Sequence, residues 1–316
     1  MSRIHEALKK AELERGQGMD APEPVVPVRT VEAATLELPP TGLEPPPSGV
    51  REPVSGTLTL DMLRERCPAG DWRPDSKAVL FADATAHTGP SGAEEFRTLR
   101  SRLYHLREKQ PLQTVLVTSA LPSEGKTFVT LNLARAIAQQ RHRGVLVIDA
   151  DLRMSRIHQA VGGAAQSPGL SEYLRGEADA LDVIQRGPQD NFFIIAGGAP
   201  NTNPVELLGT GRLRTLIHRF MPAFDWILLD SPPAAFLSDS SLLAKVSDGV
   251  VMVVQSGVTP YDTAQRACKE FAAEQLVGVV LNRVPPGLGY GYYYYYGRGY
   301  GYGKKVPAHS NGHSKK

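Results

Sequence analysis

The feature that most constrains the fold is a short loop between an apolar strand and a helix. Ser119-Ala-Leu-Pro-Ser-Glu-Gly-Lys-Thr127 follows the β-branched run 114–118 and opens a helical pattern. In this context the backbone N–H groups of the loop and of the helix N-terminus point at bound phosphate. Gly125 permits close approach, Lys126 neutralises phosphate charge, and the Thr127 hydroxyl is a ligand for Mg²⁺. The order strand–loop–helix therefore predicts a nucleoside triphosphate site.

Strands and helices alternate on both sides of this loop. Strand-like apolar runs cover 114–118, 144–149, 192–196, 226–230, 249–255 and 277–282. Helical patterns cover 94–107, 126–140, 170–175, 180–185, 204–220, 238–246 and 261–274. Continuous β-branched runs between helices are typical of a parallel sheet covered on both faces. We expect an α/β fold of the P-loop NTPase type, with a mostly parallel sheet and helices on both faces.

Acidic residues end two of the expected strands. Asp149 and Asp151 end or follow the strand 144–149, and Asp230 ends the strand 226–230. The carboxyl ends of parallel strands share one sheet edge with the phosphate loop. Asp230 is expected to hold Mg²⁺, and Asp149 and Asp151 to bind the metal or accept a proton. These acids could instead only cap the following loops, but three at one edge favour a functional site.

The ends of the chain differ in composition from the middle. Residues 1–20 carry a short helical pattern, which is either a frayed terminus or a helix that docks on a partner. Residues 21–90 begin with many prolines and predict a mostly disordered linker, although 58–66 would suit a short helix. The ordered P-loop domain is expected over 91–286, and a disordered tail over 287–316.

Tyrosine is concentrated in that tail. Eight of the eleven tyrosines lie there: Tyr290, Tyr292, Tyr293, Tyr294, Tyr295, Tyr296, Tyr300 and Tyr302. Such a tract can be an adhesive low-complexity segment. It can also be a set of phosphate acceptors, because glycine gives the chain reach and each tyrosine offers a hydroxyl.

Composition limits the remaining functions. The formal net charge of +2 is too small to indicate nucleic acid as a partner. The apolar runs are far shorter than the ~20 residues of a membrane helix, and residues 1–20 lack the apolar core of a secretion signal. Cys67 and Cys268 have no CxxC partner, so we expect a reducing compartment and no structural disulfide or zinc.

These motifs together resemble the bacterial tyrosine kinases of capsule and exopolysaccharide synthesis, over roughly residues 93–302. Asp149-Ala-Asp-Leu-Arg153 resembles the second acidic motif of that family, often called Walker A′. Leu228-Leu-Asp-Ser-Pro-Pro233 and the phosphate loop also resemble the family. Gly169–Glu177 and Asn203–Leu208 also match family segments, and the tyrosine cluster resembles the family's autophosphorylation tail.

The resemblance implies an ATP-dependent protein-tyrosine autokinase with ATP and Mg²⁺ as cofactors. The implied catalytic residues are Lys126, Asp149 and Asp151, with Asp149 the first candidate for the base and Asp151 the second. The implied ATP-binding residues are Ser123, Glu124, Gly125, Lys126, Thr127, Phe128, Arg153 and Asn282. The implied Mg²⁺ ligands are Thr127, Asp149 and Asp230, and the implied acceptors are the eight tail tyrosines. Arg153 would stabilise the acids or the phosphates, and Asn282 would contact adenine or only shape a turn.

The resemblance also implies partners. Glu94, Arg97 and Arg100 match the family's ExxRxxR motif, which mediates subunit contacts in a homo-oligomer, expected to be a ring. A membrane chain-length-determining or adaptor protein and a cognate tyrosine phosphatase are further implied partners. The kinase would be cytoplasmic and recruited through its partner to the inner face of the cytoplasmic membrane. Tail phosphorylation would add negative charge and weaken the assembly.

Two other functions stay open at this point. ATPases of the ParA and MinD type share the fold, but their loop pattern KGGxGK places a lysine where this chain has Leu121. Ala120 also replaces the first glycine of the general loop pattern. The third alternative is a nucleotide-binding scaffold with little catalysis.

Overall fold

The computed structural model describes residues 57–67, 69–70, 72–74, 92–162, 168–201, 203–234 and 238–285. The predicted helix within 1–20, the proline-rich stretch before residue 57 and all eight tail tyrosines lie outside the described residues. Within the described part, no helix has both the length and the apolar character needed to cross a membrane.

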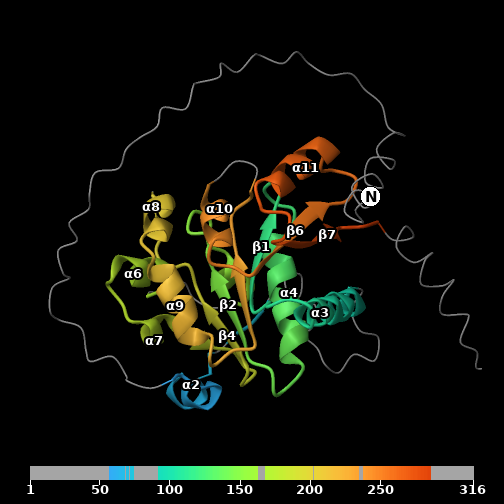
Figure 1. Cartoon of the computed structure of the whole chain (residues 1–316). Coiled ribbons are helices and arrows are strands. Elements are labelled where there is room, and N and C mark those ends of the chain that lie inside the picture. The colour runs from blue at the N-terminus through green and yellow to red at the C-terminus, as the bar shows by residue number, and fades with distance from the viewer. Residues whose placement is uncertain are drawn as a thin grey trace, which may run out of the picture.

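A seven-stranded sheet in the order β3-β4-β2-β5-β1-β6-β7 forms the centre of the domain (Figure 1). The strands are β1 (Thr114–Ser119), β2 (Val145–Asp149), β3 (Ile184–Arg186), β4 (Phe192–Ile195), β5 (Trp226–Asp230), β6 (Gly249–Gln255) and β7 (Leu276–Asn282). All neighbours are parallel except β3 and β4, which confirms the mostly parallel sheet. Every residue of β1, β2, β4 and β5 is buried, because helices cover both faces.

Helices divide between the two faces of the sheet. Side chains of α3 (Ala93–Arg107), α4 (Lys126–Ala138) and α5 (Ile157–Ala160) join the apolar cluster on one face. The cluster on the other face contains side chains of α2 (Leu60–Arg66), α6 (Leu170–Arg175), α7 (Ala180–Val183), α8 (Pro204–Gly209), α9 (Arg212–Phe220), α10 (Asp239–Ala244) and α11 (Tyr261–Lys269). The expected three-layer arrangement is therefore confirmed.

Residues 57–67, 69–70 and 72–74 wrap around the β3 edge of the sheet, and we call them the edge strap. Thr59 caps α2 by accepting a hydrogen bond from the Met62 amide, and Leu63 is fully buried on one face. Ala69 then forms a parallel bridge with Arg186 of β3. Trp72 packs edge-on against Phe192, 5.3 Å between ring centroids, in the cluster on the opposite face. The expected linker 21–90 thus contains residues that belong to the packed domain.

Several element boundaries differ from the sequence expectation. The helix expected over 204–220 is two helices, because Gly211 adopts a left-handed conformation (φ 77°) between α8 and α9. The helix expected over 180–185 ends at Val183, where the chain becomes extended and pairs antiparallel with β4. The sequence pattern of these three residues does not indicate a strand. Pairing with β4 stabilises the extended conformation of β3, and that pairing cannot be read from a short run.

Candidate functional site

The phosphate loop connects β1 to α4 at the carboxyl edge of the sheet. Ser123 and Gly125 both have positive φ, 64° and 94°, on either side of Glu124. Glycine suits position 125 for two reasons. A side chain would be strained at this φ, and an added Cβ would collide with the side-chain amide nitrogen of Asn282. α4 begins at Lys126 directly after this turn, so its first N–H groups face the loop.

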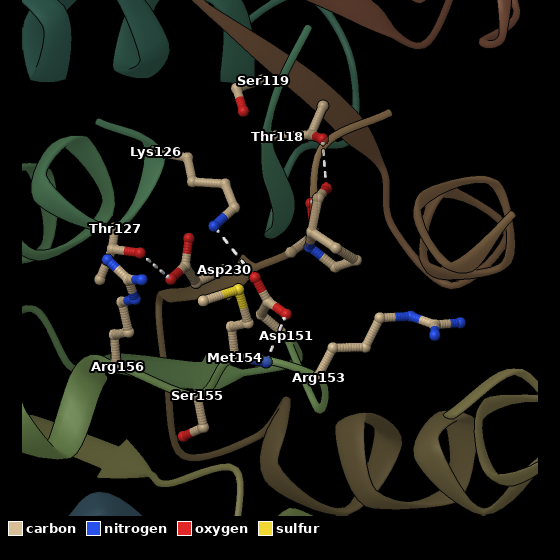
Figure 2. A network of polar contacts seen from close by, with 12 residues as sticks. Thr118, Ser119, Lys126, Thr127, Asp151, Arg153, Met154, Ser155, Arg156 and Asp230 are labelled. Carbon is tan, nitrogen blue, oxygen red and sulfur yellow. Dashed lines mark hydrogen bonds and ion pairs between the residues drawn. The ribbon is translucent and has the colours of Figure 1, made fainter. Parts of the chain in front are cut away.

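The two side chains at the start of α4 contact two of the predicted acids (Figure 2). Lys126 Nζ lies 3.0 Å from Asp151 Oδ2, and both side chains are largely buried. The Thr127 hydroxyl donates to Asp230 Oδ2 at 2.6 Å. Asp230 stands beside Asp149 in the register of β5 and β2. The structure thus brings Lys126, Thr127 and all three predicted acids into one cluster.

Asp149 lies beneath the surface of this cluster. Its Oδ2 accepts hydrogen bonds from the Ser155 hydroxyl and from the amides of Arg156 and Ile157, and its Oδ1 is buried without a hydrogen-bond partner. Burial raises the pKa of Asp149 to about 6. Burial also raises the pKa of Asp230, to about 7, although Lys126 opposes the shift. Two adjacent carboxyls kept from water therefore hold protons more tightly than usual.

Asp151 is the acid of the pair at 149–151 that is nearer to solvent. Its Oδ1 accepts from the Met154 amide at 3.0 Å, and Oδ2 contacts Lys126. Met154 itself is 59% exposed beside these acids, and sequence reasoning did not single it out. The geometry therefore favours Asp151 over Asp149 for contact with an incoming hydroxyl, because no atom of Asp149 reaches the surface in this conformation.

Arg153 is directed away from Lys126 and the acid cluster (Figure 2). Its guanidinium forms two hydrogen bonds with Asp239, 2.9 Å from Nε and 3.2 Å from Nη2. Asp239 is buried at the start of α10. The direct contact of Arg153 is therefore with Asp239, while Asp151 also raises the pKa of Arg153 through its charge. The expectation that Arg153 stabilises the phosphates stays a prediction.

Asn282 and Phe128 contact the protein rather than open space. The Asn282 amide nitrogen donates to the Glu124 carbonyl at 2.8 Å, and its oxygen accepts from the Arg283 amide at 2.9 Å. The Phe128 ring packs edge-on against Phe96 of α3, with centroids 5.8 Å apart. Asn282 therefore holds the loop, and Phe128 joins two helices. Sequence reasoning also missed Gln255 and Thr259, which contact Glu124.

The oxygen atoms at the loop suit Mg²⁺. Mg²⁺ binds through one or two carboxylates or hydroxyls together with phosphate oxygens and water, so it needs no dedicated protein cage. Thr127 and Asp230 supply such oxygens, and the unpartnered Oδ1 of Asp149 adds a third nearby. Among the described residues, no group of three or more His, Cys, Asp or Glu residues has a metal-binding arrangement. A metal held jointly with a bound nucleotide fits these residues.

The three residues of the predicted oligomer motif lie on α3. Arg97 pairs with Glu94 one turn before it at 2.8 Å, and both are exposed. Arg100 donates to the Ala136 carbonyl in the last turn of α4 at 2.6 Å. Arg100 therefore fastens α3 to α4, which leaves Glu94 and Arg97 as the exposed part of the motif.

The fold and loop define a P-loop nucleotide-binding domain. Residues 115–291 match the family model described as "CobQ/CobB/MinD/ParA nucleotide binding domain". Tyrosine-protein kinase YwqD of Bacillus subtilis (strain 168) is 31% identical over 192 residues, which cover 60% of this chain and 80% of that protein. Tyrosine-protein kinase etk of Escherichia coli (strain K12) is 32% identical over 67% of this chain but only 29% of its own length.

Solved structures agree with these sequence matches. The kinase domain of Escherichia coli tyrosine kinase ETK has a TM-score of 0.57 and 30% identity, covering 66% of this chain and 84% of that one. The chimerical protein CapA2B2 has a TM-score of 0.60 and 26% identity, covering 72% of this chain and all of that one. The chain belongs to the bacterial tyrosine kinase family.

Proposed function

We propose that this protein is an ATP-dependent tyrosine autokinase that phosphorylates its own C-terminal tyrosines. The supporting observation is the cluster in which Lys126, Thr127, Asp151 and Asp230 meet at the phosphate loop. Lys126 and Mg²⁺, held by Thr127 and Asp230, would stabilise charge on the transferring phosphoryl group. Asp151 would accept the proton of the tyrosine hydroxyl, whose ordinary pKa is about 10. Asp149, whose Oδ1 has no hydrogen-bond partner, would offer the metal a further oxygen.

The last described strand ends beside the phosphate loop. β7 ends at Asn282, whose amide contacts the loop at Glu124. Tyr290 follows eight residues later in the sequence, which is at most about 28 Å of extended chain. That reach would allow the tail to enter the site of its own subunit or of a neighbour in an oligomer.

Labelled ATP tests the activity and the direction of transfer. Wild-type protein should incorporate label into residues 290–302, and Lys126→Met should incorporate none when purified alone. Mixing Lys126→Met with a chain that ends at residue 286 should restore label to the Lys126→Met tail if transfer occurs between subunits. ATP hydrolysis without label would support a positional ATPase instead, and binding without turnover a scaffold.

The cellular role that we propose is the regulation of exopolysaccharide or capsule polymerisation and export. The family resemblance supports this role. The proposal includes assembly through Glu94 and Arg97, and recruitment from the cytoplasm to the membrane by an adaptor protein. A cognate phosphatase would reset the tail. Deleting residues 287–316 or introducing Lys126→Met should change polymer length or yield in the producing cell, and an unchanged polymer would contradict this role.

A further inference from the structure

Glu124 is a buried carboxylate inside a loop whose ligand is itself strongly negative. Its side chain is only 2% exposed, so it points into the protein and not toward the phosphates. A buried charge is costly unless hydrogen bonds compensate it. Coulomb repulsion between this carboxylate and a triphosphate would, by itself, weaken nucleotide binding. The position of Glu124 in the loop therefore requires a structural explanation.

Donors from two separate segments satisfy the carboxylate. Oε2 accepts the Leu121 amide, three residues earlier in the loop, at 2.5 Å. Oε1 accepts the Gln255 amide at 3.2 Å and the hydroxyl of Thr259. Gln255 ends β6, and Thr259 lies in the turn before α11. The carboxylate thus joins the phosphate loop to the connection between β6 and α11.

The backbone conformation around Glu124 also favours an inward direction of its side chain. The residues on either side, Ser123 and Gly125, have positive φ, so the chain turns inward at Glu124 and outward again at α4. The Glu124 carbonyl accepts the Asn282 amide at 2.8 Å, which adds the end of β7 to the same junction. When the side chain is anchored inward, the remaining N–H groups of the loop are left to face the phosphates.

We propose that Glu124 is a positioning residue, which with Thr259 holds the loop in the conformation that binds phosphate. The inference rests on the proposed nucleotide-binding function and assigns Glu124 a place behind the loop instead of a contact with ATP. It also explains how a loop with Leu121 at the lysine position of KGGxGK patterns is fixed: Leu121 contributes its backbone N–H to the carboxylate.

The direction in which one substitution changes the affinity for ATP distinguishes a positioning role from simple charge repulsion. Glu124→Gln keeps the size and removes the charge. If the carboxylate only repels the phosphates, the variant binds ATP more tightly; if it positions the loop, the variant binds ATP roughly tenfold more weakly, because charge-assisted hydrogen bonds to Leu121 and Thr259 are lost. Glu274→Gln removes an exposed acid and serves as the control, with unchanged affinity expected.

Thr259 tests the partnership directly. Thr259→Val removes the hydroxyl at constant shape and should weaken ATP binding severalfold, whereas Thr259→Ser should restore it. The double variant Glu124→Gln/Thr259→Val should bind about as well as the weaker single variant, since both changes break one contact. In autophosphorylation assays, Glu124→Gln and Thr259→Val should each raise the KM for ATP, because the empty loop is held less often in the conformation that binds phosphate.

The outcomes are distinguishable by isothermal calorimetry with ATP and Mg²⁺. Tighter binding by Glu124→Gln, or fully additive effects of the two substitutions, would overturn the positioning role. Loss of thermal stability in Glu124→Gln with unchanged affinity would also overturn it. Failure of wild-type protein to bind ATP at all would instead refute the proposed function on which the inference rests.

Discussion

Lys126 and Asp151 form an ion pair of 3.0 Å at the start of α4, in which each side chain is more than four-fifths buried. The lysine of a phosphate loop must reach the β- and γ-phosphates, so a bound nucleotide has to draw Lys126 away from Asp151. The pair therefore competes with phosphate for one cation. Asp151 therefore opposes nucleotide binding in the empty site, whereas in the proposed reaction it would promote catalysis as the base.

Asp151→Asn should separate binding from chemistry. Without Mg²⁺, the variant should bind ATP severalfold more tightly, because Lys126 is released from its carboxylate partner. Its phosphotransfer should fall by a factor of about 100 or more, as expected for a lost base. Calorimetry in EDTA and labelled-ATP turnover measure the two effects. In a Lys126→Met background the same substitution should bring no gain in affinity; a gain there would contradict the competition.

The two acids with raised pKa predict a pH dependence of stability. Asp149 and Asp230 bind protons more tightly when folded, with pKa values of about 6 and about 7. Their contribution to the free energy of unfolding is fully present below the pKa of the unfolded state, about 3.9. It is lost as the pH rises through the pKa values of the folded state. Asp230→Asn cannot titrate, so between about pH 4 and pH 7 its free energy of unfolding should fall less than that of wild type.

Urea unfolding at a series of pH values measures this difference. Glu274→Gln, which removes an exposed acid, should follow the wild-type curve. Parallel curves for wild type and Asp230→Asn would show that Asp230 titrates normally in the folded protein, and would contradict the burial of the acid pair.

Substitution of Arg153 should lower the stability of the folded protein more than it lowers the affinity for ATP. Arg153→Ala leaves the buried Asp239 without its cation and should cost about 1–3 kcal/mol in the free energy of unfolding. Adding Asp239→Asn should recover part of that loss, because a neutral amide is less costly to bury. Urea unfolding detects both changes. Unchanged stability combined with weakened ATP binding would instead place Arg153 on the phosphates.

The edge strap should be required for a stable domain. A chain beginning at residue 57 should fold with wild-type stability, whereas one beginning at residue 91 loses Leu63 from the core and Trp72 from the sheet edge. Leu63→Ala alone should cost about 2–5 kcal/mol, the usual range for a buried leucine.

Glu65→Ala in the same helix is the matched control, since Glu65 is exposed and should tolerate the change within about 0.5 kcal/mol. Equal thermal midpoints for chains beginning at 57 and 91 would show that the strap is dispensable.

Contiguous motifs carried the successful sequence predictions. The phosphate loop could be located because its residues are adjacent in sequence, and the acids could be grouped because Asp149 and Asp230 end parallel strands. The parallel sheet followed from the apolar runs between helices. Each of these predictions needed only local pattern and the geometry of a parallel sheet.

Contacts between distant residues could not be predicted in this way. Arg153 and Asp239 are 86 residues apart, and Glu124 and Thr259 are 135 apart. A lone acid or arginine in a motif gives no sign of which distant group will satisfy it. The antiparallel strand β3 was missed for a similar reason, because a three-residue strand is defined by its neighbour β4 and not by its own sequence.

The edge strap has a consequence for synthesis on the ribosome. Arg64 of the strap donates to the carbonyl of Asp190, 126 residues later in the chain. At about 5–20 residues per second, translation of that interval takes on the order of ten seconds, during which the strap has no β3–β4 edge to bind. Leu63 is therefore made early and buried late, and its apolar side chain stays exposed on the nascent chain until β3 and β4 have been synthesised.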